Sequence, residues 1–353
     1  MKGLDNRINI QHNEDLDFLK GVGICMVVLG HCITSALEAN NHILHIIKEI
    51  IYTFHMPIFF IVSGYIQGLR PYDIRRFKKF GFSQTRKYLL PYFVWSLTLY
   101  LFYYLLKTVN PGVIPERLTL NPIGVFRDIF LFKVLTGNVL WFVYILFIVT
   151  VVSYLVHSFM SNKYINLIFL LAVLIGGFLA NNFISNQLFV PKRFLVVWIY
   201  YEIGVFIARY FSNKEFRANL LLNCVLVALY AIAFKFYTIS YGFIGNSLKV
   251  LCALTAVFVL YSLSKYKNNV VYRILNYLGK RTAAIYYMHN PYIVLISVTA
   301  MTGYANLNFV PAIVIAFSLG ILVPLILQEL LFNKVGLLKG VFFGDKVWAK
   351  QIN

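Results

Sequence analysis

Residues Leu16–His31 read LDFLKGVGICMVVLGH, with a cation near one end of an apolar segment and an imidazole at the other. His31 stands eleven positions after Lys20. In an α-helix this spacing is three turns plus about 20°, so both side chains point the same way, roughly 16 Å apart along the axis. The stretch therefore predicts a membrane helix that binds a long ligand, with the anionic end of the ligand at Lys20 and its reactive end at His31.

The amino-acid composition indicates an integral membrane protein. Of the 353 residues, 60% are hydrophobic and only 13% are charged, and the mean hydropathy is +0.73. A soluble domain of this length carries more charge, because much of its surface stays in water. Apolar runs of about 20 residues, the length of a helix that crosses a bilayer, recur along the chain. The predicted fold class is all-α, a polytopic membrane helix bundle that forms one domain over residues 1–353.

About ten transmembrane helices are predicted from these runs. The polar and partly acidic start of the chain does not resemble a cleavable secretion signal, so the first run is expected to stay as a membrane helix. Residues 123–134 are apolar but too short to span, and are expected to form a re-entrant or interfacial helix on the outer side. The predicted spans lie near 18–38, 50–69, 88–106, 139–159, 164–182, 194–211, 218–237, 246–263, 282–301 and 309–332.

The basic residues predict the orientation of these helices. The net charge is +19, and most lysines and arginines lie in short connections, above all residues 70–87 and 265–281. Such connections stay on the cytoplasmic side, so an even number of helices places both termini, residues 1–17 and 333–353, in the cytoplasm. Because membrane topology accounts for the charge, no nucleic-acid partner is expected.

Three ionisable side chains inside the predicted spans are candidates for chemistry, because burying such groups in a membrane is costly. The helical rise, counted from the predicted span ends, places His31, His55 and Glu202 in one layer of the outer half of the membrane. A histidine beside a carboxylate is a general-base arrangement, in which the anion orients the imidazole. A structural interpretation is also open: a membrane histidine can bond a carbonyl across a helix interface, and Glu202 can be an ion-pair partner.

Further residues also have both a structural and a functional interpretation. Ser63 and the glycine after it allow two helix backbones to approach, and Tyr65 places an amphipathic ring near the cytoplasmic mouth. Trp141 is either an interface anchor or an aromatic platform for a sugar ring. His289 stands before Pro291, which frees a backbone carbonyl, so this histidine either fills local structure or joins the site. The four cysteines show no metal-ligand spacing, and no metal site is predicted.

Several motifs, in the same order, resemble the membrane acyltransferase 3 family. The FHMP wording is most similar to the branch that contains fucose and nodulation-factor O-acetyltransferases. The resemblance covers nearly the whole chain, and the combination is specific although each motif alone is weak. The motifs are DFLKG at Asp17–Gly21 followed by His31, FHMPIFFIVSGY at Phe54–Tyr65, RKYLLPY at Arg86–Tyr92, LWF at Leu140–Phe142 and YMHNP at Tyr287–Pro291.

The resemblance implies transfer of an acyl group, usually acetyl, from cytoplasmic acyl-CoA to a carbohydrate. Acyl-CoA is then a co-substrate, and no permanently bound cofactor is expected. In the family, a basic residue and a histidine of the first helix are both needed for activity, and the matching residues here are Lys20 and His31. Many members have arginine at the first position, whereas Lys20 supplies a point charge without a bidentate fork.

The spacing along the first helix agrees with binding of such a donor. Its flexible arm suits the roughly 16 Å between Lys20 and His31. Its phosphates are predicted to be held by basic side chains at the cytoplasmic mouth. The residues predicted to bind the donor are Lys20, Arg76, Arg86, Ser63 and Tyr65.

The chemical step is predicted to centre on the histidine of the first helix. His31, oriented by Glu202, takes the proton from a sugar hydroxyl as the hydroxyl attacks the thioester. Acyl transfer to His31 itself, as a covalent intermediate, is the competing mechanism. The residues predicted to bind the acceptor or to support the site are Asp17, His55, Trp141 and His289.

The predicted function is an integral O-acyltransferase of the cytoplasmic membrane that modifies a hydroxyl of a cell-surface polysaccharide or of its lipid-linked precursor. The expected partners are acyl-CoA, the carbohydrate acceptor and membrane lipids, and the sequence leaves the oligomeric state open. The alternative function is a transporter or exporter of glycans or small molecules, in which buried histidine and glutamate form a proton relay.

Overall fold

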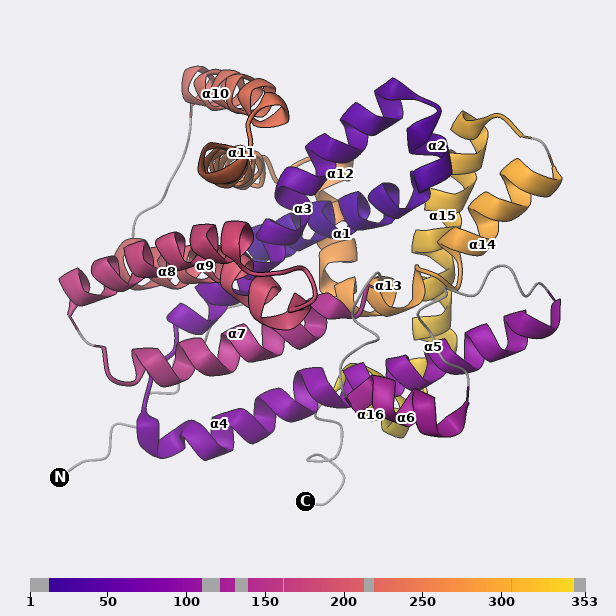
Figure 1. Ribbon diagram of the computed structural model, residues 1–353, viewed down its shortest axis with the longest axis horizontal. Coiled ribbons are helices and arrows are strands. Elements are labelled where there is room, and N and C mark those ends of the chain that lie inside the picture. Colours follow the sequence, from indigo (N-terminus) through magenta and orange to yellow (C-terminus); the bar gives the residue numbers. More distant parts are fainter. Residues whose placement is uncertain are drawn as a thin grey trace. The chain divides into compact units, whose positions relative to one another are not determined.

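The computed structural model describes residues 13–109, 121–130, 139–160, 162–212, 219–305 and 307–345, which form helices and turns without a strand (Figure 1). For these residues the all-α fold class is confirmed. The chain divides into two units, each described by itself. Unit 1 consists of Met1–Met26, Ile46–Ile74 and Ser153–Thr282, and unit 2 of Val27–His45, Arg75–Val152 and Ala283–Asn353.

Seven helical segments among the described residues are long and apolar enough to cross a membrane. Each overlaps one of the predicted spans. Three predicted spans have no counterpart among the seven, so the number of ten spans stays a prediction, as does the cytoplasmic position of the termini. The seven segments are His42–Gly68, Ile74–Lys107, Lys163–Phe183, Phe189–Phe211, Leu220–Ile239, Gly242–Leu263 and Phe309–Phe332.

The three other predicted spans are helices that are more charged, shorter or interrupted. Helix α1, Glu14–Cys32, has three acidic residues in its first turn, where the helix dipole favours them. Helix α7, Trp141–His157, has 17 residues. The prediction of one helix over 282–301 is wrong, because α13, Thr282–Met288, stops before α14, Val294–Thr299. The physical reason is Pro291, which has no backbone N–H to continue the first helix.

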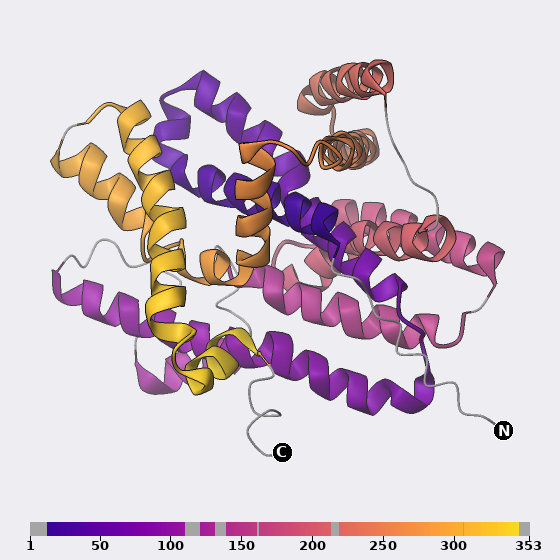
Figure 2. The same cartoon turned by 180° about the vertical axis from the view of Figure 1, so that it is seen from behind.

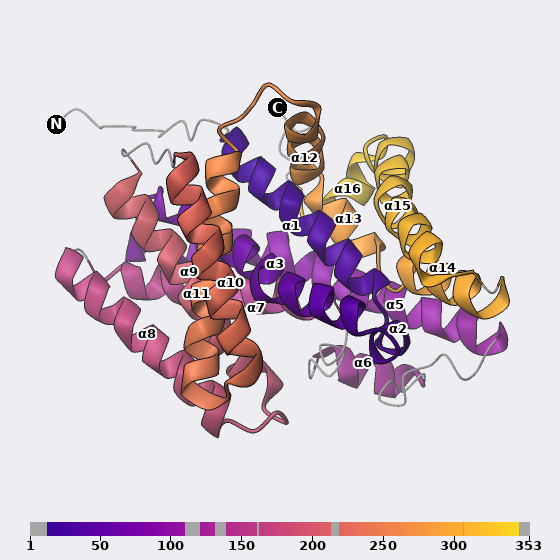
Figure 3. The same cartoon turned by 90° about the horizontal axis from the view of Figure 1, so that it is seen from above.

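Unit 1 is built from most of α3 and from long helices that follow α7. Helix α8 packs against α9, and α10 lies along α11, as Figures 1 and 3 show and Figure 2 shows from behind. The first turns of α1 also belong to this unit. The bounds are α3, His42–Gly68; α8, Lys163–Phe183; α9, Phe189–Phe211; α10, Leu220–Ile239; α11, Gly242–Leu263; and α12, Val270–Lys280.

Helices α3 and α9 meet backbone to backbone in unit 1. A Cβ atom at Gly64 would collide with the carbonyl oxygen of Tyr201, and one at Gly204 with that of Ile61. Only glycine therefore fits at these two positions. The predicted close approach of two backbones next to Ser63 is confirmed.

Unit 2 contains the end of α1, the first part of α7 and the C-terminal helices. The N–H of Trp95 on α5 donates to the carbonyl of Phe342 on α16 at 2.9 Å, which joins these two helices. A nine-residue helix, α6, covers the first part of the stretch 123–134 in which a short re-entrant or interfacial helix is predicted. Residues 131–134 lie outside the described residues, and the side of the membrane stays a prediction. The bounds are α2, Ser35–Ala39; α4, Phe77–Gln84; a π-helical turn, Thr85–Leu89; α5, Leu90–Val109; α6, Pro122–Phe130; α15, Phe309–Leu327; and α16, Gly336–Phe343.

Candidate active site

Helix α1 carries both the predicted phosphate-binding lysine and the predicted general base. In its unit 1 part, Lys20 Nζ lies 2.6 Å from Asp17 Oδ1, and the two side chains are 27% and 5% exposed. An ammonium has three N–H donors, so two remain for a ligand beside this ion pair. In its unit 2 part, His31 lies in the last turn of the helix, which ends at Cys32.

Ion pairs hold the start of α1 against the segment that follows α11. Lys265 Nζ lies 2.5 Å from Asp15 Oδ2, and Lys267 Nζ lies 3.4 Å from Glu14 Oε2. Burial lowers the pKa of Lys265, but hydrogen bonds to Asp15 and Tyr261 outweigh burial, so the pKa is raised. The ammonium is therefore charged at neutral pH and fixes this end of α1.

A cavity of about 520 Å³ lies in unit 1 between α1, α3, α9 and α11. Its walls are mostly aliphatic and include Leu16 and Leu19 of α1. Three residues with hydroxyl groups, Tyr65, Ser212 and Tyr261, also line it. A largely apolar cavity of this size with a few polar groups is typical of a small-molecule site. One predicted donor-binding residue, Tyr65, thus lines the cavity.

The other predicted donor-binding residues lie outside the lining of this cavity. Lys20 follows a wall residue of α1, and Ser63 precedes the glycine that contacts α9. In unit 2, Arg76 is exposed at the end of a 3₁₀ turn. There, Arg86 Nη2 donates to the carbonyl oxygen of Asp345 at 2.5 Å. A phosphate site shared by Lys20 and the two arginines stays a prediction.

Two histidines that are far apart in the sequence lie together in unit 2. The ring centres of His31 and His289 are 5.2 Å apart, with an angle of 55° between the ring planes. His289 is fully buried, and its Nδ1 donates to the carbonyl oxygens of Ile285 at 2.9 Å and Tyr286 at 2.8 Å. Its Nε2 is buried and has no partner among the described residues. Nδ1 of His289 therefore has the structural role predicted for this residue, because it bonds the carbonyls of α13. Nε2 is the nitrogen that could take part in a site.

Aromatic side chains fix α13, the helix that ends one residue before His289. The hydroxyl of Tyr286 donates to the carbonyl of Val139, and its ring packs edge-on against Phe142. The next residue, Tyr287, stacks on Trp95 with ring centres 5.4 Å apart and planes only 3° from parallel. These contacts determine the orientation of α13 at the point where it ends.

Glu202, predicted to orient His31, is bonded in unit 1 to residues that sequence reasoning did not single out. Its Oε2 lies 2.7 Å from Nε2 of His157. Its Oε1 accepts hydrogen bonds from Ser153 Oγ at 2.5 Å and from Trp198 Nε1 at 2.8 Å. A pairing of Glu202 with His31 would join the two units and stays a prediction.

The imidazole of His157 links this carboxylate to a cation. Arg209 Nη1 donates to Nδ1 of His157 at 3.2 Å, so the ring proton is on Nε2 and points to Glu202. The guanidinium lies 4.3 Å from the ring centre of Tyr72, and Nη1 also donates to Asn166 at 3.4 Å. An open pocket of about 430 Å³ borders this end of the cluster. His157 therefore bridges the carboxylate of Glu202 and the guanidinium of Arg209.

The two other residues predicted to support the acceptor make local contacts. His55 Nδ1 donates to the carbonyl of Ile51, one turn earlier in α3, at 2.8 Å. Because α3 begins at His42, His55 lies in the middle of the helix and not a few residues from its start. At the start of α7, the ring of Trp141 packs edge-on against Phe142 at 6.3 Å. Acceptor binding by either residue stays a prediction.

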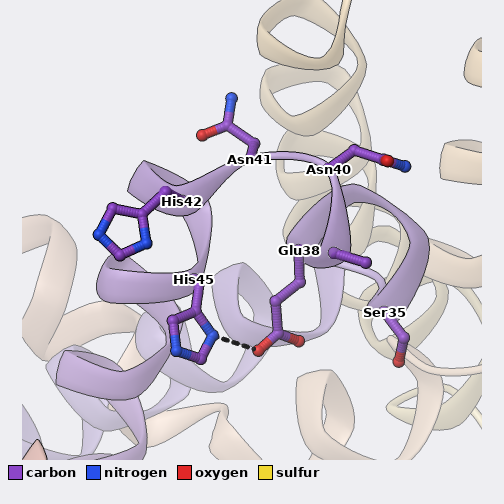
Figure 4. A pocket seen from close by; sticks show the side chains of 7 residues that line it. Ser35, Glu38, Asn40, Asn41, His42 and His45 are labelled. Carbon is purple, nitrogen blue, oxygen red and sulfur yellow. Dashed lines mark hydrogen bonds and ion pairs between the residues drawn. The ribbon is translucent and has the colours of Figure 1, made fainter.

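A polar pocket of about 500 Å³ lies in unit 2 between α2 and the start of α3, shortly after His31 in the chain (Figure 4). Across it, His45 Nδ1 lies 3.0 Å from Glu38 Oε1. The ring centre of His42 is 6.3 Å from that of His45. No group of three or more His, Cys, Asp and Glu side chains in the described part of the chain is placed to hold a metal ion.

Comparison with known proteins gives a family match over most of the chain. Residues 13–329 match a family described as an acyltransferase domain, acyltransferase 3. Nodulation protein NolL of Sinorhizobium fredii is 42% identical over 59 residues, which are 16% of this chain and 16% of that protein. No solved structure matches the chain.

Proposed function

The chain belongs to the acyltransferase 3 family and has several helices long and apolar enough to span a membrane, and we propose that it is a multi-pass membrane acyltransferase that transfers an acyl group from acyl-CoA to a carbohydrate hydroxyl. The proposed location is the cytoplasmic membrane and the proposed acyl group is acetyl. The observation that carries the proposal is that Leu16 and Leu19 of α1 line a ligand-sized cavity, with Lys20 next in the chain, and that His31 in the last turn of the same helix lies beside His289.

The cavity in unit 1 supports a donor with a flexible arm. The arm of coenzyme A combines methylene groups with two amides, and the cavity combines aliphatic walls with the hydroxyls of Tyr65, Ser212 and Tyr261. Lys20, held by Asp17, supplies the two remaining N–H donors of its ammonium to a phosphate oxygen. Asp17 is thus a supporting residue that orients the lysine.

The proposed reaction moves one proton and one acyl group. His31 takes the proton of the acceptor hydroxyl while the hydroxyl oxygen attacks the thioester carbonyl. The carbon–sulfur bond then breaks, and the thiolate of coenzyme A takes the proton back from the imidazolium. In the second possible route, His31 carries the acyl group as a covalent intermediate before the hydroxyl attacks.

The polar pocket after α1 supports binding of an acceptor rich in hydroxyl groups. Glu38 accepts hydrogen bonds, and His42 and His45 can donate or accept them. The pocket follows α1 directly in the chain, and His31 and these residues belong to unit 2. We therefore propose that it receives the carbohydrate close to the general base.

The alternative function, a transporter with a proton relay, requires a buried histidine that can accept and release protons. In the Glu202 cluster, Nδ1 of His157 accepts from Arg209 and Nε2 donates to Glu202. A ring whose nitrogens are both engaged has no free position to accept a proton. This geometry argues against a proton relay through His157.

Radiolabelled acetyl-CoA tests the proposal with purified protein in lipid nanodiscs. The acceptor is surface glycan isolated from a strain that lacks the gene, and mass spectrometry and NMR of that glycan against the parent strain identify the modified hydroxyl. We expect the wild type to transfer label, and His31→Ala to bind acetyl-CoA but transfer none. Lys20→Gln is expected to weaken donor binding tenfold or more, because a charge-assisted hydrogen bond contributes about 1.5–3 kcal/mol.

The melting temperature controls for damage to the fold. Ser318→Ala, which removes a hydroxyl-to-carbonyl bond on α15, is the matched variant that should keep both binding and transfer. Failure of the wild type to label the unmodified glycan would overturn the proposed function. Normal donor binding by both Lys20→Gln and His31→Ala would overturn the division of roles between them.

A further inference from the structure

We infer that His289 is a positioning residue for His31: its Nε2 lone pair accepts the N–H of His31 and thereby directs the other nitrogen of His31 to the acceptor hydroxyl. This inference rests on the proposed function. It deepens that function by naming the group that orients the general base.

The hydrogen bonds of His289 determine its tautomer. Its Nδ1 faces the carbonyl oxygens of Ile285 and Tyr286, which only accept hydrogen bonds, so the proton is on Nδ1. Nε2 then carries a lone pair. This atom is buried without a partner among the described residues, and a buried acceptor without a donor is costly. Such an atom is expected to have a donor in the working enzyme.

The main chain holds the ring of His289 in a fixed direction. The backbone N–H of His289 donates to the carbonyl oxygen of Ile285 at 2.9 Å, and the backbone carbonyl of His289 accepts from the N–H of Val294 at 2.8 Å. Pro291 cannot donate to the end of α13, and the Nδ1 hydrogen bonds of His289 supply a donor to that turn instead. The residue is therefore anchored through its backbone and through one ring nitrogen, which leaves the other ring nitrogen at a defined place.

The imidazole of His31 lies against the imidazole of His289. The ring centres are 5.2 Å apart and tilted by 55°, so the edge of one ring can face the other. A neutral imidazole has one N–H and one lone pair on opposite sides of the ring. An N–H of His31 held by His289 leaves the lone pair of His31 facing away, where a base has to present it.

Two substitutions separate this role from a structural one. Asparagine at position 289 reaches the position of Nδ1, so His289→Asn keeps a donor for the carbonyls of α13 but offers nothing at Nε2. Glutamine reaches the position of Nε2, so His289→Gln offers an acceptor there. If His289 only fills the end of α13, the asparagine variant keeps the activity.

The experiment measures kcat, the KM for acetyl-CoA and the melting temperature of both variants in nanodiscs. We expect His289→Asn to lower kcat about 100-fold or more, with an unchanged KM for the donor and a melting temperature near that of the wild type. We expect His289→Gln to recover part of the lost kcat. Ser318→Ala in the same unit is the control for loss of a side-chain-to-carbonyl bond.

Wild-type kcat in His289→Asn would overturn the inference, and so would a glutamine variant that is folded but no more active than the asparagine variant. If either variant is unfolded, binding of labelled acetyl-CoA and transfer are measured in His289→Lys, which places a donor and no acceptor at the Nε2 position, and in His289→Leu, which places neither. Activity in both would overturn the inference. A wild type without any transfer is a different result, because it contradicts the proposed function and not the role of His289.

Discussion

Nε2 of His157 lies 2.7 Å from Oε2 of Glu202, and the two side chains are only 3% and 2% exposed. Arg209 closes the arrangement on the other ring nitrogen, so a neutral imidazole stands between a buried anion and a cation. Burying a carboxylate is costly unless it is paired and fully hydrogen-bonded. Ser153, Trp198 and His157 supply its donors, so the stability of the cluster depends on all of its members.

Glu202→Gln keeps the shape of the side chain but removes the buried charge. It leaves Arg209 without its anion, so we expect a loss of about 3 kcal/mol in the free energy of unfolding. Thermal unfolding in detergent, followed by circular dichroism, measures it. The control is Glu329→Gln, which neutralises an exposed carboxylate and should have little effect. Equal melting temperatures for the two variants would contradict a stabilising role of the cluster.

Gly64→Ala introduces a methyl group where α3 touches the carbonyl of Tyr201. We expect the two helices to be forced apart, with a loss of about 1–3 kcal/mol in stability. Gly176→Ala is the matched control, since nothing lies within 4 Å of a Cβ there, and alanine in a helix interior should raise stability by about 0.5–1 kcal/mol. Melting temperatures that shift in the same direction for both variants would contradict the backbone contact.

Leu254→Trp fills part of the cavity with an indole ring. If the cavity receives the donor, the affinity for acetyl-CoA should fall about tenfold or more, because the indole takes up volume that the donor needs and one methylene in an apolar pocket already changes the binding free energy by about 1–3 kcal/mol. The control is Leu221→Trp on α10, where the leucine is 72% exposed. Equilibrium binding of labelled acetyl-CoA compares them. Unchanged affinity in a folded Leu254→Trp variant would exclude this cavity as the donor site.

Lys265→Gln removes the ammonium that pairs with Asp15. Burial lowers the pKa of Lys265, yet hydrogen bonds to Asp15 and Tyr261 raise it overall in the folded protein. A group whose pKa is higher in the folded than in the unfolded protein stabilises the folded state while it is protonated. The stabilisation is complete below the unfolded-state pKa of about 10.4 and disappears as the pH rises through the folded-state pKa. The variant should be less stable by about 1 kcal/mol at neutral pH.

The difference between wild type and Lys265→Gln should shrink above a pH of about 10.5. Melting temperatures of both proteins from neutral to strongly alkaline pH test this dependence. A difference that stays constant over the whole range would mean that the pair contributes nothing and that the variant acts through packing alone.

The length of the apolar runs predicts most of the helices. A chain segment in hydrocarbon has to form all of its backbone hydrogen bonds internally, and an α-helix does so. Run length misplaces the start of α3, which begins at His42 and not near residue 50, since the first turns contain histidine, lysine and glutamate and lie outside the apolar run. It also misses the break between Met288 and Val294. Pro291 signals a break there, but the apolar residues on both sides made the stretch resemble one span.

Side-chain partners are harder to predict than helices. Ser153 and His157 are four residues apart on α7, and Trp198 and Glu202 are four residues apart on α9, so each pair shares a helix face. This spacing is visible in the sequence. Which two faces meet depends on the rotation and the neighbours of each helix, and the pattern of residues in a uniformly apolar helix does not determine them. The sequence therefore predicts Glu202 as a buried carboxylate but does not identify His157 as its partner.

The contact of Gly64 with Tyr201 and of Gly204 with Ile61 lies beside the cavity, whose lining includes Ile61 and Ile203. Packed side chains can change rotamer to admit a thicker guest, whereas two touching main chains have no such freedom. The width of the cavity is therefore fixed on the side where α3 and α9 touch. Discrimination between slender and branched donor molecules would then be set by the backbone itself, and remodelling of surrounding side chains would not relax it.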